Sequence, residues 1–287
     1  MEIFELRYFL GVAQTENIHR ASEKLRVSPG SLSKAVSRIE EELGARLFSR
    51  EGRTIRLTEQ GRYLKGKAVE ILRLEESARL EIAGRHGRIH ALIAGPEVLL
   101  CHFGLGVAER ITKRNPESVI EYVACSDAQA IEKVRQGDVH LAIVTGEVPR
   151  ELTQLALSDT EFKTAVGKTH PLYSRARAGQ TIVVSEVLRH GFVCPSHAWL
   201  GQVGPHQSSD GWRDDQFPRK VEHLTSSLKL LEKTVTSGKA IAYLPDYLVN
   251  DLNLAVVKTT GCPYHCSQSI RLIAKRPKEV GWIQSLF

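Results

Sequence analysis

Boundary signals of a helix flank residues 29–43 of this sequence. Ser28 suits the N-cap of a helix, Pro29 suits its first position, and Gly44 suits the left-handed residue that ends it. The apolar residues between them recur at helical spacing and form one stripe, made of Leu32, Val36, Ile39 and Leu43. We expect this stripe to pack on neighbouring helices, which leaves the opposite face of the helix pointing outward.

Two further helices are expected before this one. The first spans about Glu2 to Gln14, where apolar side chains recur three and four positions apart. Asn17 is a suitable N-cap for the second, in which Ala21 and Leu25 face inward. A turn over residues 26–28 joins the second helix to the third. This order of helix, turn and capped helix is typical of a helix-turn-helix module that binds DNA.

The outward face of the third helix is small, polar and basic. Short hydroxyl side chains let a helix approach the major groove closely, and Lys and Arg reach phosphates or guanine edges. The candidate DNA contacts of this helix are Ser28, Pro29, Ser31, Ser33, Lys34, Ser37 and Arg38. The acidic run Glu40–Glu42 lies at the end of the helix that would leave the groove.

A short basic hairpin is expected next, over about residues 53–57. Arg50, Arg53 and Arg56 are placed to contact the DNA backbone or the adjacent minor groove, and such contacts position a protein without reading sequence. Between Leu43 and Leu74 the chain carries eight basic and only three acidic residues. This local excess of positive charge, beside a helix-turn-helix pattern, favours phosphate contact over a merely solvated surface.

A long helix follows, from a Thr58 cap to about Ala83. Five apolar residues lie four, three, seven and four positions apart, which fits a coiled-coil seam with a second copy of the chain: Leu64, Ala68, Ile71, Ala78 and Ile82. Packing of this stripe against the helix's own domain is the alternative. Residues 84–87 (Gly-Arg-His-Gly) end the helix, and we expect them to form a hinge.

After the hinge, short apolar runs alternate with helical patterns. Strands are expected over residues 89–95, 119–124, 141–145, 191–194, 240–244, 254–258 and 270–275. Helices are expected over about 98–114, 128–136 and 226–237. Strands that alternate with helices are typical of an α/β domain with a parallel sheet. Residues 205–218 are expected to form a polar loop.

Together these features resemble the LysR-type transcriptional regulators. The resemblance rests on A-x-x-x-L-x-V-S-x-x-S-L-S-x-x-V-x-x-I-E-x-x-L-G-x-x-L-F-x-R at 21–50, followed by L-T-x-x-G at 57–61. It implies an all-α winged helix-turn-helix DNA-binding domain over 1–58 and a linker helix with a hinge over 59–87. It also implies a two-lobed α/β effector-binding domain over 88–287, similar to periplasmic binding proteins. Lobe one would comprise about 89–160 and 257–287, and lobe two about 161–256.

The resemblance also implies partners. Members of the family bind double-stranded DNA as dimers paired into tetramers, and their C-terminal domain binds a small-molecule effector between its lobes. RNA polymerase is a further partner that a regulator of this kind can have. Carried onto this chain, the effector-binding residues are Pro96, Glu97, Val98, Ser126, Asp127, Ser196, His197, Thr225 and Ser226.

The nature of the effector stays open at this point. Free N–H groups at helix N-termini favour a carboxylate. Glu97, however, would repel a carboxylate, so an amine-bearing or neutral effector is an alternative. Ser126 and Ser226 are equally suited to capping the helices that they precede.

The main alternative function is that of a constitutive or architectural DNA-binding protein, whose C-terminal domain only oligomerises. An enzyme is not expected, because the chain has no G-x-S-x-G, no phosphate-binding glycine loop and no paired metal motif. We therefore expect no cofactor. The pair Cys262 and Cys266 lacks a second pair of ligands for zinc, and a redox-sensing thiol pair is the remaining variant.

A cytoplasmic location, with no membrane partner, is the expectation from the sequence. No run of 18 apolar residues occurs, and the N-terminus lacks the basic start of a signal peptide.

Overall fold

The computed structural model describes residues 1–51, 54–82, 89–201, 203–262, 264–277 and 280–287. It consists of two compact units, of which residues 1–88 supply most of the first and residues 89–134 and 139–275 supply most of the second. Within the described residues, every helix is too short or too polar to cross a membrane.

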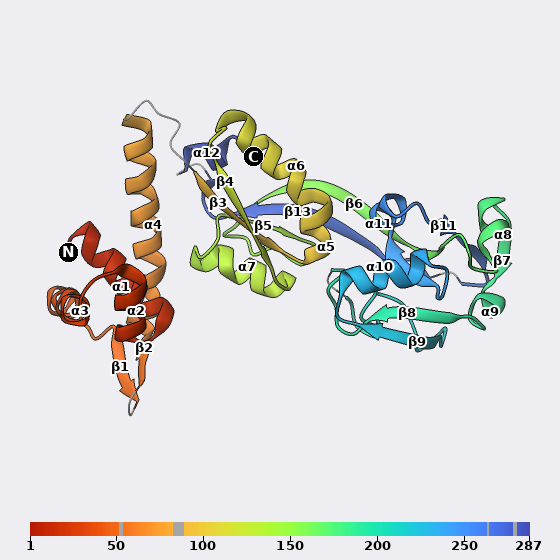
Figure 1. The fold of residues 1–287 in the computed structure, drawn as a ribbon, viewed down its shortest axis with the longest axis horizontal. Coiled ribbons are helices and arrows are strands. Elements are labelled where there is room, and N and C mark those ends of the chain that lie inside the picture. Colours follow the sequence, from red (N-terminus) through yellow and green to blue (C-terminus); the bar gives the residue numbers. More distant parts are fainter. Residues whose placement is uncertain (52–53, 83–88, 202, 263, 278–279) are drawn as a thin grey trace. The chain divides into compact units, whose positions relative to one another are not determined.

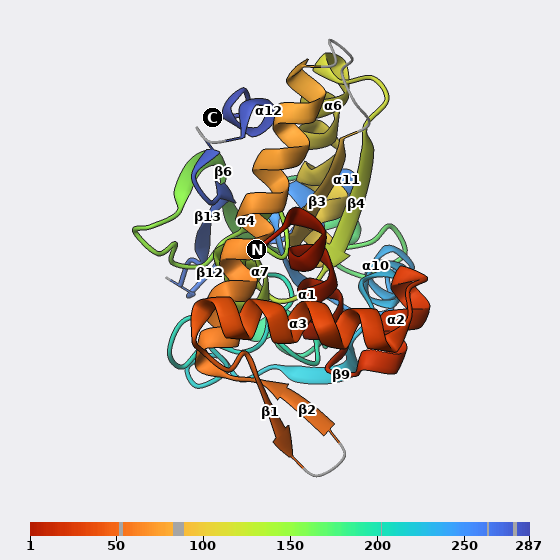
Figure 2. The same cartoon turned by 90° about the vertical axis from the view of Figure 1, so that its left-hand side faces the viewer.

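The first unit contains the three helices that the sequence predicts. They are α1 (Ile3–Thr15), α2 (Ile18–Leu25) and α3 (Pro29–Leu43). A hairpin of β1 (Phe48–Glu51) and β2 (Thr54–Leu57) follows and extends away from the helices in Figure 2, and α4 (Glu59–Ile82) completes the unit. Asn17 Oδ1 and Ser28 Oγ each accept a hydrogen bond of 3.1 Å from the backbone N–H three residues on, and Gly44 has φ +62°. These helix-boundary predictions are confirmed.

The core of the first unit lies where α1, α3 and α4 meet, around Phe9 and Ile39, which are both fully buried. Val36 packs, partly buried, on a second cluster around Leu32. The predicted stripe of α3 is wrong at Leu43, which is 46% exposed. Leu43 occupies the last turn of α3, directly before the Gly44 cap, and belongs to neither cluster.

The predicted seam on α4 also needs correction. Leu64 and Ala68 are buried in the cluster around Phe9, and Ile71 packs partly buried against the same cluster. These three side chains therefore face their own domain, because α4 lies against α1, and they are not free for a second copy. Ala78 is exposed, and the side chain of Ile82 lies outside the described residues.

The second unit has two lobes. The first lobe contains β3 (His90–Gly95), α5 (Glu97–Leu99), a π-helical turn η1 (Leu100–Gly104), α6 (Leu105–Arg114), β4 (Val119–Ala124), α7 (Asp127–Gln136) and β5 (Leu141–Val144). The second lobe contains α8 (Tyr173–Arg177), β7 (Thr181–Val183), α9 (Val184–Val187), β8 (Gly191–Pro195), β9 (Lys220–Thr225), α10 (Leu228–Thr236), β10 (Ala242–Pro245), α11 (Asp246–Asp251), β11 (Ala255–Val256) and β12 (Lys258–Thr260). The long strand β6 (Thr153–Val166) and its partner β13 (Ser267–Ala274) join the lobes, as Figure 1 shows. A short helix near the C-terminus, α12 (Gly281–Gln284), belongs to the first unit.

The main sheet is mixed, which corrects the prediction of a parallel sheet. Its strand order is β10-β6-β13-β5-β3-β4. β3 is parallel to β4 and β5, whereas β13 is antiparallel to β5 and β6, and β10 is antiparallel to β6. The sequence-based prediction missed β6, β7 and β9. It also placed one strand over 254–258, where the structure has the two short strands β11 and β12.

A buried ionic cluster holds the second lobe between β8 and β9. The guanidinium of Arg219 donates to Asp210 at 2.6 and 3.1 Å and to Asp214 at 2.9 and 3.0 Å. Its side chain is 1% exposed, and its Cζ lies 5.2 Å from the ring centroid of Trp212. Residues 205–218 are therefore not a simple polar loop, because Asp210 and Trp212 are buried. This segment occupies the crossover between two parallel strands.

The charge state of this cluster makes its stability depend on pH. Burial opposes ionisation of Asp214, but hydrogen bonds from Arg219 and Ser208 outweigh it and lower the pKa of that carboxyl. A carboxyl with a lowered pKa in the folded state stabilises the fold above its unfolded pKa and loses this contribution as the pH falls through the folded value.

We expect Arg219→Met to lower the free energy of unfolding of the second lobe by about 3–5 kcal/mol, because the buried carboxylate of Asp210 and the partly exposed one of Asp214 lose their cation. Arg213→Met, which breaks a more exposed pair with Asp215, should cost about 1 kcal/mol or less. Urea denaturation followed by Trp fluorescence measures both. Equal, small losses would contradict a structural role for the Arg219 cluster.

Candidate DNA interface and effector-binding surface

The outward face of α3 carries all the residues predicted to contact DNA from this helix. Each of the seven is exposed: Ser28, Pro29, Ser31, Ser33, Lys34, Ser37 and Arg38. The opposite face is buried at Leu32, Ala35 and Ile39. The structure therefore brings the seven side chains together on one accessible surface, as the apolar stripe predicts.

Two acidic side chains beneath this surface orient arginines on it. Arg38 forms an ion pair of 3.3 Å with Glu5, whose side chain is only 2% exposed. Glu16 forms an ion pair with Arg56 of β2 and accepts from the backbone N–H of Leu57 at 3.3 Å. A hydrogen bond from Arg56 lowers the pKa of Glu16; desolvation opposes it, and the hydrogen bond from Leu57 N–H lowers the pKa further. The turn after α1 is thus tied to the hairpin.

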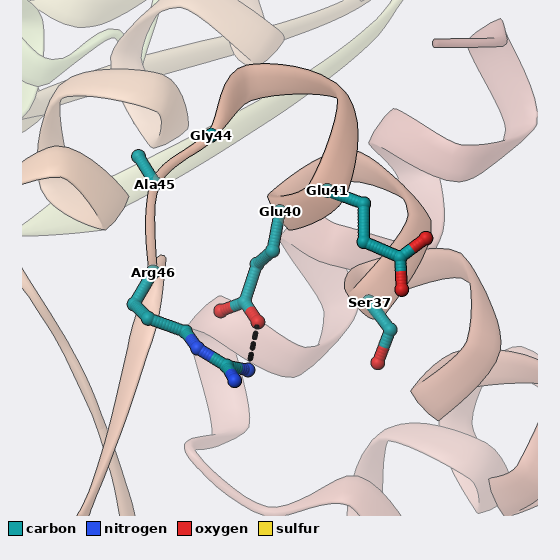
Figure 3. Close-up of a pocket in the computed structure, with 6 residues that line it drawn as sticks. All are labelled: Ser37, Glu40, Glu41, Gly44, Ala45 and Arg46. Carbon is teal, nitrogen blue, oxygen red and sulfur yellow. Dashed lines mark hydrogen bonds and ion pairs between the residues drawn. The ribbon is translucent and has the colours of Figure 1, made fainter.

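Glu40 links α3 to the hairpin. Its carboxylate accepts from the backbone N–H groups of Leu47 at 2.7 Å and Phe48 at 3.2 Å, and from Arg46 Nη1 at 2.9 Å. Figure 3 shows Glu40 turned toward Arg46, while Glu41 points away from it. The first of the three acids at the end of α3 is therefore structural. It fixes where β1 begins relative to the outward face of α3.

The open pocket in Figure 3 lies at this junction. It has a volume of about 420 Å³ and is lined by Ser37, Glu40, Glu41, Gly44, Ala45 and Arg46. Its walls come from the end of α3 and the turn into the hairpin.

The L-T-x-x-G motif closes the other side of the hairpin. Thr58 Oγ1 donates to the carbonyl of Arg46 at 2.7 Å and accepts from the N–H of Gly61 at 3.0 Å. A Cβ on Gly61 would collide with the carbonyl oxygen of Leu47. The glycine is needed here because two backbone segments approach closely.

The structure describes the three hairpin arginines to different extents. Arg56 is exposed on β2. Arg50 lies on β1, but its side chain is outside the described residues, as is the whole of Arg53. Ser49 and Arg56 face each other across the hairpin register.

The predicted effector-binding residues of the first lobe fall into two groups. Glu97 is exposed at the start of α5, whereas Pro96 and Val98 are buried, Val98 at 1% exposure. Ser126 caps α7, since its Oγ accepts from the N–H of Gln129 at 3.4 Å and its own N–H donates to that side chain. Asp127 accepts from Thr145 Oγ1 at 2.6 Å. Val98 is thus a core residue, and the capping alternative for Ser126 is supported.

In the second lobe, Ser196 and His197 are exposed and lie 3.1 Å apart through Oγ and Nδ1. Thr225 is buried and accepts from the N–H of Ser227 at 3.0 Å. The predicted cap of α10 is wrong by one position: Ser227, not Ser226, accepts from the N–H of Leu230, because the turn at Thr225 delays the helix start.

A group of residues that the sequence analysis missed lies where the two lobes meet. His102 Nδ1 of η1 lies 2.5 Å from Asp251 Oδ2 of α11, and its ring centroid lies 4.7 Å from that of Tyr247. The ring of Phe103 lies edge-on to the same Tyr247 at 5.3 Å. Only the aromatic content of C-H-F and D-Y-L could have signalled this group, and nothing local relates segments 145 residues apart.

Burial disfavours the thiolate form of four of the cysteines, which are Cys101, Cys125, Cys194 and Cys266. Burial raises the pKa of the Cys194 thiol to about 12 and also raises the pKa of Cys266. Cys262 is partly exposed, and residue 263 beside it is outside the described residues. Among the described residues, no three His, Cys, Asp or Glu side chains are gathered as a metal ion would need.

Comparison with known proteins decides the family. Residues 3–62 match the model of the bacterial regulatory helix-turn-helix protein, lysR family, and residues 85–277 match the LysR substrate binding domain. The chain belongs to the LysR family. It is a LysR-type DNA-binding transcriptional regulator with an effector-binding domain.

Curated relatives agree with this assignment. The Hca operon transcriptional activator HcaR of Escherichia coli is 28% identical over 255 residues, which cover 87% of this chain and 83% of that protein. The transcriptional regulator IlvY of Escherichia coli is 31% identical over 147 residues, which cover 50% and 49%.

Solved structures share the fold. Full-length LysG from Corynebacterium glutamicum with bound effector Arg superposes with a TM-score of 0.67 at 17% identity, over 99% of this chain and 95% of that chain. Full-length CbnR in complex with its target DNA superposes with a TM-score of 0.55 at 16% identity, over 99% and 97%. These likenesses support the order of helix-turn-helix unit, linker helix and two-lobed domain.

We expect Glu40→Ala to destabilise the first unit by about 1–3 kcal/mol, because two backbone N–H groups and Arg46 lose their acceptor. Glu41→Ala removes an equal charge from the next position and should change the stability by about 0.5 kcal/mol or less. Thermal unfolding followed by circular dichroism compares the two. A larger loss for Glu41→Ala than for Glu40→Ala would show that Glu40 does not fix the hairpin.

Proposed function

We propose that this regulator binds a specific operator with the outward face of α3 in the major groove and the β1–β2 hairpin on the flanking backbone. The observation that carries the proposal is the single accessible face from Ser28 to Arg38, opposite a buried face of the same helix. Small hydroxyl groups on this face permit close approach, and Lys34 has no ion pair among the described residues. The structure of CbnR with its target DNA supports the same use of the fold.

Arg50, Arg53 and Arg56 would then contact phosphates or the minor groove beside the helix. Arg56 shares its guanidinium with Glu16 in the free protein and is exposed, so a phosphate can compete with Glu16 for it. Such contacts would position the protein and contribute most of the salt dependence of binding.

In our proposal an effector bound between the lobes changes the way the protein holds its operator. A ligand has this effect when it binds one arrangement of the lobes more tightly than another. The match to the LysR substrate binding domain over 85–277 favours this function over a constitutive DNA-binding protein. The structure of LysG with bound Arg supports a small-molecule site in a domain of this fold. The predicted contacts that are exposed are Glu97, Ser126, Ser196, His197 and Ser226.

We propose that the protein catalyses no reaction and needs no cofactor, and that it acts in the cytoplasm where its DNA target lies. Its named relatives are transcriptional regulators. RNA polymerase would be the partner through which a bound regulator changes transcription.

We further propose that the effector-binding domain pairs with a second copy through one face of each lobe. On the first lobe, Leu105 of α6 is 63% exposed beside the edge strand β4, where Val119 and Tyr122 are also exposed. On the second lobe, Leu224 of β9 is 68% exposed and Leu230 of α10 is 55% exposed. Each of these faces combines a helix and a strand with exposed apolar side chains. They suit a two-fold interface in which the first lobe of each copy packs on the second lobe of the other. Pairs of such dimers, joined near Ala78 and Ile82, would form the tetramer typical of the family.

The operator test uses the DNA upstream of the protein's own gene in fluorescence anisotropy, with excess unrelated DNA and two salt concentrations. Tight binding that survives the competitor is expected. Lys34→Ala should weaken it about tenfold or more, as loss of a charged contact in the groove does. Lys239→Ala, an exposed lysine of the second unit, is the matched control. Binding lost to competitor, or unchanged in Lys34→Ala, would remove α3 from this role.

The self-association test is sedimentation velocity of Leu105→Glu. A buried charge at an apolar interface should weaken the association of two copies, so the protein should sediment as a smaller assembly than the unchanged protein does. Val183→Glu, a substitution of an exposed apolar residue outside both faces, should sediment like the unchanged protein. Unchanged sedimentation of Leu105→Glu would rule out this face.

A further inference from the structure

The surface between the lobes combines three aromatic rings. His102 and Phe103 lie on the π-helical turn η1 of the first lobe, and Tyr247 lies on α11. The rings of His102 and Tyr247 are tilted by 32° at 4.7 Å, and Phe103 meets Tyr247 at 73°. A π-helical turn is rare and costs hydrogen-bond geometry, so it is most often kept where side chains must be aimed at a functional site. Here it aims two successive rings at the other lobe.

The hydroxyl of Tyr247 is buried without a hydrogen-bond partner. The residue is 7% exposed, and its Oη makes no hydrogen bond within the described part of the chain. A buried polar group without a partner destabilises the fold, because it has lost its hydrogen bonds to water. A ligand group that reaches this oxygen would recover that cost.

Acidic side chains surround the hydroxyl. Burial raises the pKa of Tyr247, and the charges of Asp127, Asp246 and Asp251 raise it further. Asp246 is held in place by Thr160 Oγ1 at 2.6 Å, and Asp251 by His102. The phenol therefore lies in a negative field that disfavours its own ionisation.

The same negative field extends along η1 toward α10. Burial raises the pKa of the Cys101 thiol, and the charges of Glu97 and Glu232 add to this effect. Glu232 is paired with Lys229 at 2.9 Å. Glu97 is exposed and forms no ion pair with any residue that the structure describes.

From this arrangement we propose that the effector carries an organic cation, an ammonium or a guanidinium group, which binds between η1 and α11. Its N–H groups donate to Tyr247 Oη and to the Glu97 carboxylate, and the partly exposed ring of Phe103 contributes cation–π attraction. This inference rests on the proposed function, in which an effector binds between the lobes.

An ammonium or guanidinium fits this surface better than the other ligand classes. A carboxylate would be repelled by Glu97 and by the charges of Asp127, Asp246 and Asp251. A metal ion would need several carboxylate, imidazole or thiolate donors gathered at one point, and the described residues offer no such group. Aromatic faces beside acids are the surroundings that organic cations prefer.

The test is titration calorimetry of the full chain with pairs of small probes that share a carbon skeleton. The pairs are benzylamine with benzoate and butylamine with butyrate, and agmatine adds a guanidinium. At least one cationic probe is expected to bind, and each carboxylate is expected to bind more weakly than its paired amine. No binding by any cationic probe, or tighter binding by a carboxylate, would overturn the inference.

Two variants with a control locate the site. Glu97→Gln should weaken the best cationic probe about tenfold or more, the loss expected for a charge-assisted hydrogen bond. Glu109→Gln, which removes an equal charge from an exposed position of α6, should leave its affinity within about twofold. Tyr247→Phe should weaken the probe without lowering the unfolding temperature of the unliganded protein, since the hydroxyl has no partner to lose. Equal affinity in all three variants would overturn the site.

Operator binding of the same samples separates this inference from the proposed function. If a carboxylate probe binds and alters operator affinity, the proposal of a regulator controlled by an effector is supported, and only the inference of a cationic effector is overturned. If a cationic probe binds at Glu97 while no operator is bound specifically, the cation site is supported and the proposed regulatory function is contradicted.

Discussion

The antiparallel ladder between β6 and β13 is the contact on which the two-lobed domain depends. Its register runs from Thr153 opposite Ala274 to Glu161 opposite Ser267, with a bulge between Ile270 and Arg271. On one side of the bulge β13 also pairs with β5 of the first lobe, and β6 continues beyond the ladder to pair with β10 and β11 of the second lobe.

Because a bulge interrupts regular pairing and bends a strand, it offers a natural point at which the lobes can change their mutual angle. The contact of His102 with Asp251 joins the two lobes beside this ladder. Each such contact is worth on the order of 1 kcal/mol, so a ligand that binds between the lobes needs only a modest difference in affinity to shift the balance.

The sequence predicted most of the first unit because its signals are local. Asn17, Ser28 and Gly44 act on the backbone within a few residues, and the alternation of buried and exposed positions on α3 is a property of one helix. Long-range packing is what the sequence did not reveal. The stripe of Leu64 and Ala68 has the spacing of an intermolecular seam, yet it packs on α1 of the same domain, and spacing alone does not distinguish the two. Glu40 reads as one of three surface acids, although its backbone partners lie seven and eight residues away.

Strands and ion pairs of the second unit were missed for related reasons. The middle of β6 reads Ser-Asp-Thr-Glu at 158–161, and β9 reads Lys-Val-Glu-His at 220–223, so neither has the apolar run by which strands were recognised. Arg219 and Asp210 look like solvated charges in a polar stretch, but they satisfy each other in the interior. Composition reports the polarity of a residue, whereas burial depends on whether a partner is within reach. The effector-binding residues carried over from the family were similarly mixed, since position in a motif does not say whether Val98 points into the core or Thr225 into a turn.

The arrangement of charge on the DNA-binding unit follows one rule. Glu5, Glu16 and Glu40 are each paired with one arginine, Arg38, Arg56 and Arg46 respectively. The acids are largely or partly buried, whereas the arginines are 62%, 58% and 84% exposed. An acid fixed in the protein surface restrains a guanidinium without enclosing it, so in the proposed complex part of the entropy of ordering a long side chain would already be lost before DNA binds. Exposed pairs of this kind are weak, and a phosphate can share or replace the acid at small cost. Three arginines that would otherwise sample many rotamers are thus held at the rim of the surface formed by α3 and the hairpin. Each acid lowers the net charge of the unit by one. In return, the cations are held in a fixed geometry. A fixed geometry favours binding to DNA in one position over diffuse attraction to any polyanion.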